Sequence, residues 1–126
     1  MNDDVSQNQA LSVAKEIRLS LESDLVSYNE LLFLAKGSVR NVEFTPLIES
    51  VILELLTSGV EIGQAFLVEK HVKFVGWRGD INQRISRARA KVESCPEEEN
   101  SRWAFWLCLA ENVDEYETLL VHDRLF

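Results

Sequence analysis

The residues of this chain that could do covalent or metal chemistry are few and stand apart in the sequence. The two cysteines, Cys95 and Cys108, and the two histidines, His71 and His122, form no close pair of the kind that binds zinc or activates a nucleophile. A structural zinc site needs about four ligands at organised spacing. No glycine-rich phosphate loop occurs either. The sequence therefore predicts a protein that is not an enzyme and has no metal or other cofactor.

The cysteines and tryptophans have simpler structural interpretations. Cys108 lies in the apolar run from Trp103 to Ala110 and is expected to be a small buried side chain. Cys95 falls in a predicted loop, and a disulfide is not expected in a cytoplasmic chain. The tryptophans are interpreted as core aromatics rather than as the walls of a ligand cage. They are Trp77, Trp103 and Trp106.

One stretch of the chain is basic. Positions 78–91 contain five cationic residues and one anionic residue, Asp80, so this stretch has a net charge of +4. Arg84, Arg87 and Lys91 have helical spacing and share one face of a predicted helix. This face either pairs with acidic neighbours on the same chain or binds an anion, an acidic partner or RNA. No aromatic residue is interleaved on it, so a stacking platform for single strands is not indicated.

The rest of the chain is strongly acidic. The whole sequence of 126 residues has 13 basic and 21 acidic side chains and a net charge of -8, so the other residues carry -12. Between positions 93 and 117 the net charge is -7. These carboxylates either keep the protein soluble or form a surface complementary to a cationic partner. The candidate partner-binding residues are Glu97, Glu98, Glu99, Asp114, Glu115 and Glu117.

Length and hydropathy predict one domain, residues 1–126, with a real core. The chain is 46% hydrophobic, and no segment approaches the ~20 apolar residues that cross a bilayer. The first residues, Met-Asn-Asp-Asp-Val, resemble neither a secretory signal nor a transit peptide. The sequence therefore predicts a cytoplasmic protein that does not enter membranes.

Three helices are predicted in the N-terminal half. Residues 1–9 are polar and expected to fray, and an amphipathic helix follows them. Ser27 and Glu30 match a capping box for a second helix that stops at Gly37. Thr45 is the predicted cap of a third helix, whose apolar stripe runs on to Gly59. The first helix is predicted from the spacing of Leu11, Ala14, Ile17, Leu21 and Leu25.

The apolar period changes from 3.6 to 2 after Gly59, which is typical of strands. Alternating runs at positions 60–66 and 72–77 flank the polar connection Glu69-Lys70-His71. This arrangement predicts a β-hairpin with His71 in its turn.

A further helix and strand are predicted after the hairpin. Asp80 and Gln83 match a second capping box, and the helix they begin has a narrow apolar stripe. The run 103–110 is apolar at every position and predicts a strand covered on both faces, although a buried helix has the same pattern. The tail 114–126 is expected to form a short helix that docks on the body. The apolar stripe of the helix that begins after Asp80 consists of Ile81, Ile85, Ala88 and Val92.

This order of elements resembles a winged-helix domain over about residues 27–77. The segment Leu55 to Gly63 carries the resemblance, because winged helices run from their third helix through a glycine into the first wing strand. The remainder resembles small uncharacterised bacterial proteins. The expected fold class is α+β, with a helical N-terminal half, a winged-helix-like helix–hairpin unit, a further helix and a C-terminal strand.

A winged helix usually implies DNA binding, but the charge of this chain argues against it. Affinity for DNA comes largely from Lys and Arg that neutralise phosphates. The third helix, which would enter the major groove, holds Glu49 and Glu54 and no cation over residues 45–58.

The sequence therefore favours a non-enzymatic, acidic protein–protein interaction module. Such a chain resembles an immunity protein, which would occlude the basic cleft of a nuclease toxin. The alternative is a winged-helix regulator that binds nucleic acid through Arg84, Arg87 and Lys91. Homodimerisation through an edge of the hairpin is a third hypothesis.

Overall fold

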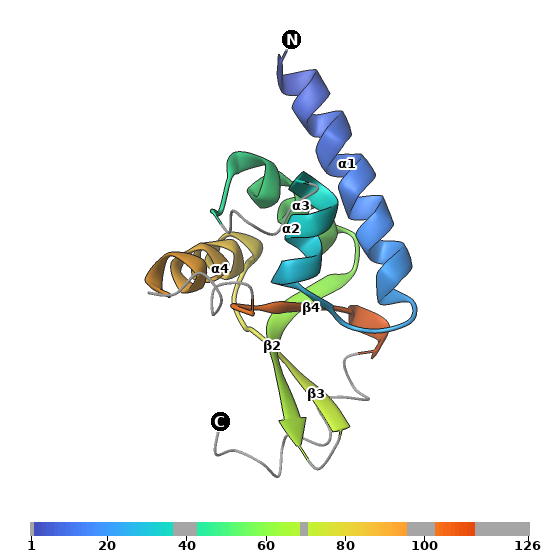
Figure 1. The fold of residues 1–126 in the computed structure, drawn as a ribbon, viewed down its shortest axis with the longest axis vertical. Helices are drawn as coiled ribbons and strands as arrows, with labels where there is room; N and C mark the ends of the chain where they lie inside the picture. The colour runs from blue at the N-terminus through green and yellow to red at the C-terminus, as the bar shows by residue number, and fades with distance from the viewer. Residues whose placement is uncertain (1, 37–42, 69–70, 96–102, 113–126) are drawn as a thin grey trace.

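The structure is a computed structural model that describes residues 2–36, 43–68, 71–95 and 103–112 (Figure 1). It confirms the α+β fold class and the helical N-terminal half. The described elements are α1 (Asn2–Leu21), β1 (Val26–Ser27), α2 (Tyr28–Lys36), α3 (Pro46–Thr57), β2 (Val60–Val68), β3 (His71–Gly76), α4 (Ile81–Ser94), β4 (Trp106–Leu109) and the 3-10 turn Ala110–Asn112.

Helix α1 buries a stripe that differs from the predicted one. Leu11, predicted to face the core, is 49% exposed, because the buried face instead begins at Ala10 and continues through Val13. Leu25 lies beyond the end of the helix and is buried against the sheet. Residues 1–9 were predicted to fray, but the backbone is helical from Asn2. Extending a helix that has already formed costs little, because each added residue gains a hydrogen bond. The buried stripe is Ala10, Val13, Ala14, Ile17 and Leu21.

The predicted caps form at the next two helices. The amide of Glu30 donates to the hydroxyl of Ser27 over 3.3 Å, before α2. The amide of Ile48 donates to the hydroxyl of Thr45 over 3.3 Å, and Pro46 is the first residue of α3. The predicted stop at Gly37 lies outside the described residues. The core residues of α3 are Ile48, Val51, Ile52, Leu55 and Leu56.

The strands form an antiparallel sheet in the order β1-β4-β2-β3. Strand β2 pairs with β4 through residues 60–63 and with β3 through residues 63–68. The hairpin is therefore confirmed, but His71 is the first residue of β3 rather than a turn residue. Strand β1 falls where the second helix was predicted to start, because two residues give no alternation to recognise.

Gly63 is the point where β2 changes partners. It pairs with Gly76 in β3 and with Trp106 in β4. A Cβ atom on Gly63 would overlap the carbonyl oxygen of Val75. The two facing glycines thus allow the backbones to approach closely where the hairpin leaves the sheet.

The helices lie together on one side of the sheet, and the outer part of the β2–β3 hairpin extends away from them (Figure 1). Alternate residues of β4 point to two different cores. Leu107 and Leu109 belong to the large core shared with the helices, whereas Cys108 joins Leu25 and Phe74 in a small core on the other face. The predicted strand covered on both faces is therefore confirmed, but it is shorter than predicted, because residues 103–104 form a turn.

An aromatic cluster joins the elements at the centre of the large core. Tyr28 packs on Phe105 with ring centroids 4.8 Å apart and on Phe44 at 6.4 Å. Trp77, which follows β3, meets Phe105 edge-on at 6.4 Å. Burial, and secondarily the nearby charge of Glu43, raises the pKa of Tyr28 far above its usual value.

The winged-helix resemblance stays a prediction. Within residues 27–77 the described elements are the end of β1, then α2, α3 and the hairpin. The sheet is completed by β4, which comes later in the sequence and lies between β1 and β2. Among the described residues, no helix has the length and hydropathy that crossing a bilayer requires.

Candidate functional site

The six carboxylates predicted to bind a partner lie outside the described residues. Glu97, Glu98 and Glu99 precede the described segment that starts at residue 103, and Asp114, Glu115 and Glu117 follow residue 112. They therefore stay predictions. The described part of the candidate site is the basic helix α4 and the surfaces beside it.

Helix α4 begins with the predicted capping box. The amide of Gln83 donates to the carboxylate of Asp80 over 2.8 Å, and the Asp80 amide donates to the side-chain oxygen of Gln83 over 2.9 Å. Ile85, Ala88 and Val92 are buried, and Ile81 is partly buried, as the stripe predicted. The helix is therefore held in place by a narrow apolar face.

The first arginine of α4 is paired within the chain. The Nη1 atom of Arg84 donates to the carboxylate of Glu61 in β2 over 2.8 Å. Its side chain is only 13% exposed, and its buried Nε–H has no hydrogen-bond partner among the described residues. A guanidinium that is buried and paired in this way is poorly placed to neutralise a phosphate.

The other two arginines of α4 are held by aromatic rings. The Arg87 guanidinium lies 4.6 Å from the centre of the Trp77 ring. The Arg89 guanidinium lies 5.2 Å from the Phe44 ring, and its Nη2 donates to Glu49 in α3 over 2.6 Å. Such cation–π contacts stabilise by about 0.5–1 kcal/mol at exposed sites. The arginines of α4 therefore hold the helix against the aromatic cluster.

This arrangement bears on the predicted basic face of Arg84, Arg87 and Lys91. Arg84 is largely buried, Arg87 is exposed but stacked, and Lys91 is partly buried. Of the three residues, only Arg84 has an acidic partner in the chain, and Arg87 instead contacts an aromatic ring. Whether this face binds a ligand stays a prediction. The aromatic partner of Arg87 comes from the segment before the helix, which helical spacing on α4 alone does not indicate.

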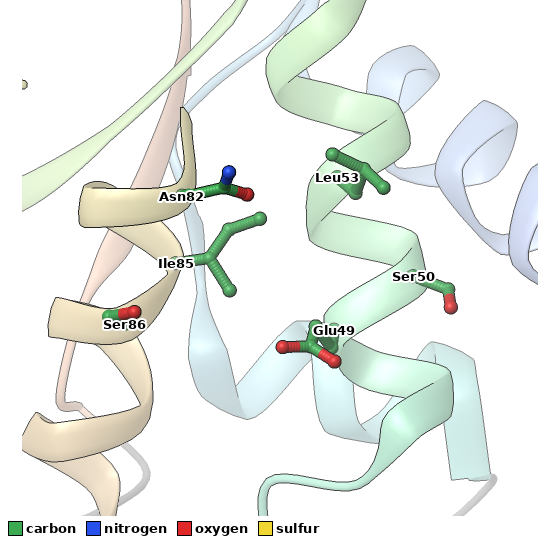
Figure 2. A pocket seen from close by; sticks show the side chains of 6 residues that line it. All are labelled: Glu49, Ser50, Leu53, Asn82, Ile85 and Ser86. Atoms are coloured by element: carbon green, nitrogen blue, oxygen red, sulfur yellow. The ribbon is translucent and has the colours of Figure 1, made fainter. Parts of the chain in front are cut away.

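A groove of about 310 Å³ separates α3 from α4. Figure 2 shows Ile85 of α4 pointing towards α3, with the Glu49 carboxylate near one end of the groove and the Asn82 amide near the other. Leu53 adds an exposed apolar side chain, and Ser86 adds a hydroxyl. The groove can therefore offer hydrogen-bond acceptors around an apolar floor.

The groove shows no arrangement that would activate a nucleophile. The hydroxyl of Ser50 points away from the Glu49 carboxylate in Figure 2, and that carboxylate is already bonded to Arg89. A serine nucleophile needs a base within hydrogen-bond reach. Within the described residues, no group of three His, Cys, Asp or Glu side chains could hold a metal ion.

Helix α3 also lacks the charge of a recognition helix. Its residues include no Lys or Arg, and Glu49 and Glu54 are both partly exposed. A phosphate backbone would be repelled by this surface.

The tryptophan predictions divide three ways. Trp77 is buried as predicted, and Trp106 is half-buried. Trp103 is 50% exposed, so its assignment to the core is wrong. It lies in a turn before β4 and stacks on Trp106, with ring centroids 5.7 Å apart and the planes at 23°. The stretch of glutamates and polar residues just before Trp103 was a signal that this end of the apolar run approaches the surface.

The thiol of each cysteine contacts a backbone carbonyl oxygen of its own chain. Cys108 is buried as predicted, and its thiol lies 3.3 Å from the carbonyl oxygen of Leu109. Cys95 follows α4, and its thiol donates to the Lys91 carbonyl over 3.1 Å. Both are free cysteines. Of the two histidines, His71 is placed only by its backbone, as the first residue of β3, and His122 lies outside the described residues.

Comparisons of the chain with protein-family models, with curated proteins and with solved structures find no match.

Proposed function

We propose that this protein is a non-enzymatic, acidic module that binds a basic protein in the cytoplasm. Its mode of action would be that of an immunity or inhibitor protein, which covers the cationic cleft of a nuclease-type toxin. Blockade would be steric, and opposite charge would speed the encounter and select the partner.

The observation that carries this proposal is the engagement of the α4 arginines. All three arginines of α4 contact an acidic or aromatic side chain of their own chain. Two of these arginines, Arg84 and Arg89, are neutralised by carboxylates of the chain itself, so residues 78–91 offer less free positive charge than their sequence suggests, whereas the whole chain has a net charge of -8. This balance supports a cationic partner and argues against a nucleic-acid ligand.

The competing function is a winged-helix regulator that binds nucleic acid through Arg84, Arg87 and Lys91. The exposed position of Arg87 is the observation in its favour. The acidic character of α3 and the burial of Arg84 stand against it. Both functions can be tested in one experiment.

The test is affinity capture from native cell lysate at low and at high salt, with mass spectrometry and nucleic-acid staining of the eluate. We expect one basic protein that salt releases. The captured protein is then purified, and its nuclease activity is measured with and without an equimolar amount of this chain. A partner whose nuclease activity is blocked supports the proposal. Nucleic acid in the eluate, lost when Arg84, Arg87 and Lys91 are replaced by glutamine, would establish the regulator instead.

The role of the acidic residues is tested by variants of equal net charge. One variant replaces Glu97, Glu98 and Glu99 by glutamine, and a second replaces Asp114, Glu115 and Glu117 by their amides. The control replaces three acidic residues elsewhere in the chain by glutamine, namely Glu16 in α1, Glu22 just after α1 and Glu54 in α3.

We expect the first two variants to slow association with the purified partner about ten-fold at low salt, because electrostatic steering dominates encounter rates. The control should slow it much less. Equal effects in all three would show that net charge alone matters, and unchanged rates with unchanged salt dependence would contradict the proposed surface.

A further inference from the structure

The groove between α3 and α4 is lined mostly by polar side chains. The side chains of Asn82 and Ser86 are exposed and form no hydrogen bond with the described residues. The volume of about 310 Å³ is at the lower end of the range for ligand sites, so the groove suits one side chain rather than a whole helix. The residues that line it, all labelled in Figure 2, are Glu49, Ser50, Leu53, Asn82, Ile85 and Ser86.

The carboxylate of Glu49 is the charged group of this lining, and it has room for a second donor. Its Oε1 accepts from Nη2 of Arg89 over 2.6 Å, whereas its Oε2 has no partner among the described residues. A carboxylate has about four acceptor positions, and this side chain is 41% exposed. The Arg89 guanidinium lies over the Phe44 ring and does not itself line the groove. A further cation can therefore reach Oε2 from the groove.

The rim of the groove has a net negative charge. The pair with Arg89 offsets the carboxylate inside the groove, but Glu54 follows the lining residue Leu53 and is partly exposed. Helix α3 contains no Lys or Arg. The remaining arginines of α4 contact Glu61 and Trp77, which do not line the groove. Charge therefore favours a cationic occupant.

The shape of the groove distinguishes a lysine from an arginine. Leu53, which is 42% exposed, follows Glu49 by four residues, or about 6 Å along α3, and Ile85 points towards α3 from the other wall (Figure 2). The four-carbon stem of a lysine has about this length. An arginine fork binds best to both oxygens of one carboxylate, and Arg89 already uses one of them. A single ammonium needs only the other oxygen.

We propose that the groove between α3 and α4 holds a lysine side chain of the cationic protein partner, with its ammonium at Glu49 and its stem against Leu53 and Ile85. This inference rests on the proposed function and adds to it a site on the described residues. A phosphate or an acidic side chain would meet the carboxylates of α3. An apolar segment would cover the amide and hydroxyl groups of the groove without hydrogen bonds. A second copy of the chain would bring together two molecules of net charge -8.

The test uses the full chain and a hexa-lysine peptide at low salt. Binding is followed in NMR spectra through the side-chain amide signals of Asn82 and the methyl signals of Leu53 and Ile85. We expect these signals to shift, and the methyl signals of Leu19 on α1, which is 61% exposed, to stay in place. A hexa-arginine peptide at the same concentration should shift the groove signals less. Larger shifts with hexa-arginine would overturn the assignment to lysine.

Matched variants test the carboxylate and the apolar wall. Glu49→Gln removes the charge and keeps an oxygen that can accept from Arg89, whereas Glu54→Gln changes net charge equally on the same helix outside the lining. We expect Glu49→Gln to weaken hexa-lysine binding about two- to five-fold more than Glu54→Gln does, in line with an exposed ion pair. Leu53→Ala should weaken it about two-fold, and Leu19→Ala should leave it unchanged. The amide spectrum of each variant checks that the fold is kept.

The possible results separate this inference from the proposed function. If hexa-lysine binds but the groove signals stay in place, or if Glu49→Gln and Glu54→Gln weaken binding equally, the site is wrong while the acidic module stands. If the groove signals move with protein concentration in the absence of peptide, the groove binds a second copy and the inference is overturned. If the native chain does not bind the peptide at all, the inference is overturned as well. The proposed function is then decided separately by the capture experiment.

Discussion

Helices α3 and α4 lie on either side of one groove but pack against the rest of the fold through different contacts. Helix α3 buries five large apolar side chains and carries no cation, whereas α4 buries only Ile85, Ala88 and Val92 and adds three arginines that reach neighbouring elements. Apolar burial holds α3, and polar contacts supplement a narrow stripe in α4. The comparison teaches that a basic run in a sequence can serve packing as well as binding.

The largest expected effect compares the same truncation in the two helices. Ile52→Ala in α3 removes a fully buried side chain, whereas Ile85→Ala in α4 removes one that lines the open groove. We expect Ile52→Ala to lower the free energy of unfolding by about 3–5 kcal/mol and Ile85→Ala by about 2 kcal/mol, because the groove side leaves less of a cavity. Urea denaturation of both variants measures the difference. Equal losses would show that α4 is held by apolar contacts as firmly as α3.

The second prediction compares the ion pairs of α4. Glu61→Gln leaves the guanidinium of Arg84 largely buried without a charged partner, and should cost about 1–3 kcal/mol of unfolding free energy. Glu49→Gln leaves Arg89, which is 41% exposed, and should cost about 0–1 kcal/mol. Denaturation at low and high salt is the measurement. Salt should reduce the small effect at Glu49 and leave most of the larger effect at Glu61. The reverse order would mean that the Arg84 pair contributes less than the Arg89 pair to holding α4.

The third prediction concerns the two N-terminal caps. Asp80→Ala removes the 2.8 Å hydrogen bond from the Gln83 amide to the Asp80 carboxylate and keeps the 2.9 Å bond from the backbone amide of residue 80 to Gln83, whereas Thr45→Ala removes one bond of 3.3 Å. We expect losses of about 1–2 kcal/mol for Asp80→Ala and about 0.5–1 kcal/mol for Thr45→Ala. Asp80→Ser is the control, since serine also caps helices. A larger loss of unfolding free energy for Thr45→Ala than for Asp80→Ala would contradict this expectation. It would show that α4 does not depend on its cap more than α3 does, despite its narrower apolar stripe.

These contrasts explain which parts of the fold the sequence predicts. The caps at Thr45 and Asp80 and the stripes behind them are local patterns, and both helices form where they indicate. Strand β1 has only two residues and exists because β4, about eighty residues later, pairs with it. No local pattern carries that information. The same holds for Leu11, since the helical spacing fits more than one face of α1.

The candidate site was predictable to a smaller degree. Charge spacing correctly placed the cations of α4 on a helix, but their partners Glu61, Trp77, Phe44 and Glu49 come from other elements. Only the folded chain brings these groups together. The exposure of Trp103 depends on where the strand begins; the apolar run itself does not mark that point, and the only local signal is the polar stretch just before Trp103.

The smallest expected effect extends the comparison to α2, where a charge opposes folding. The pKa of Glu30 is raised in the folded chain, first by partial desolvation and then by the charge of Asp24, so the ionised carboxylate is less favourable folded than unfolded. Below the carboxyl's pKa in the unfolded chain both states are protonated, and no penalty exists. The penalty grows as the pH rises through the folded pKa and is complete at neutral pH. Glu30→Gln should therefore stabilise the protein at pH 7 by less than about 0.5 kcal/mol, because solvent screens this exposed side chain, and its advantage should shrink as the pH falls. Thermal unfolding of both proteins between pH 3 and 7 tests this, and an advantage that grows at low pH would reverse the assigned sign.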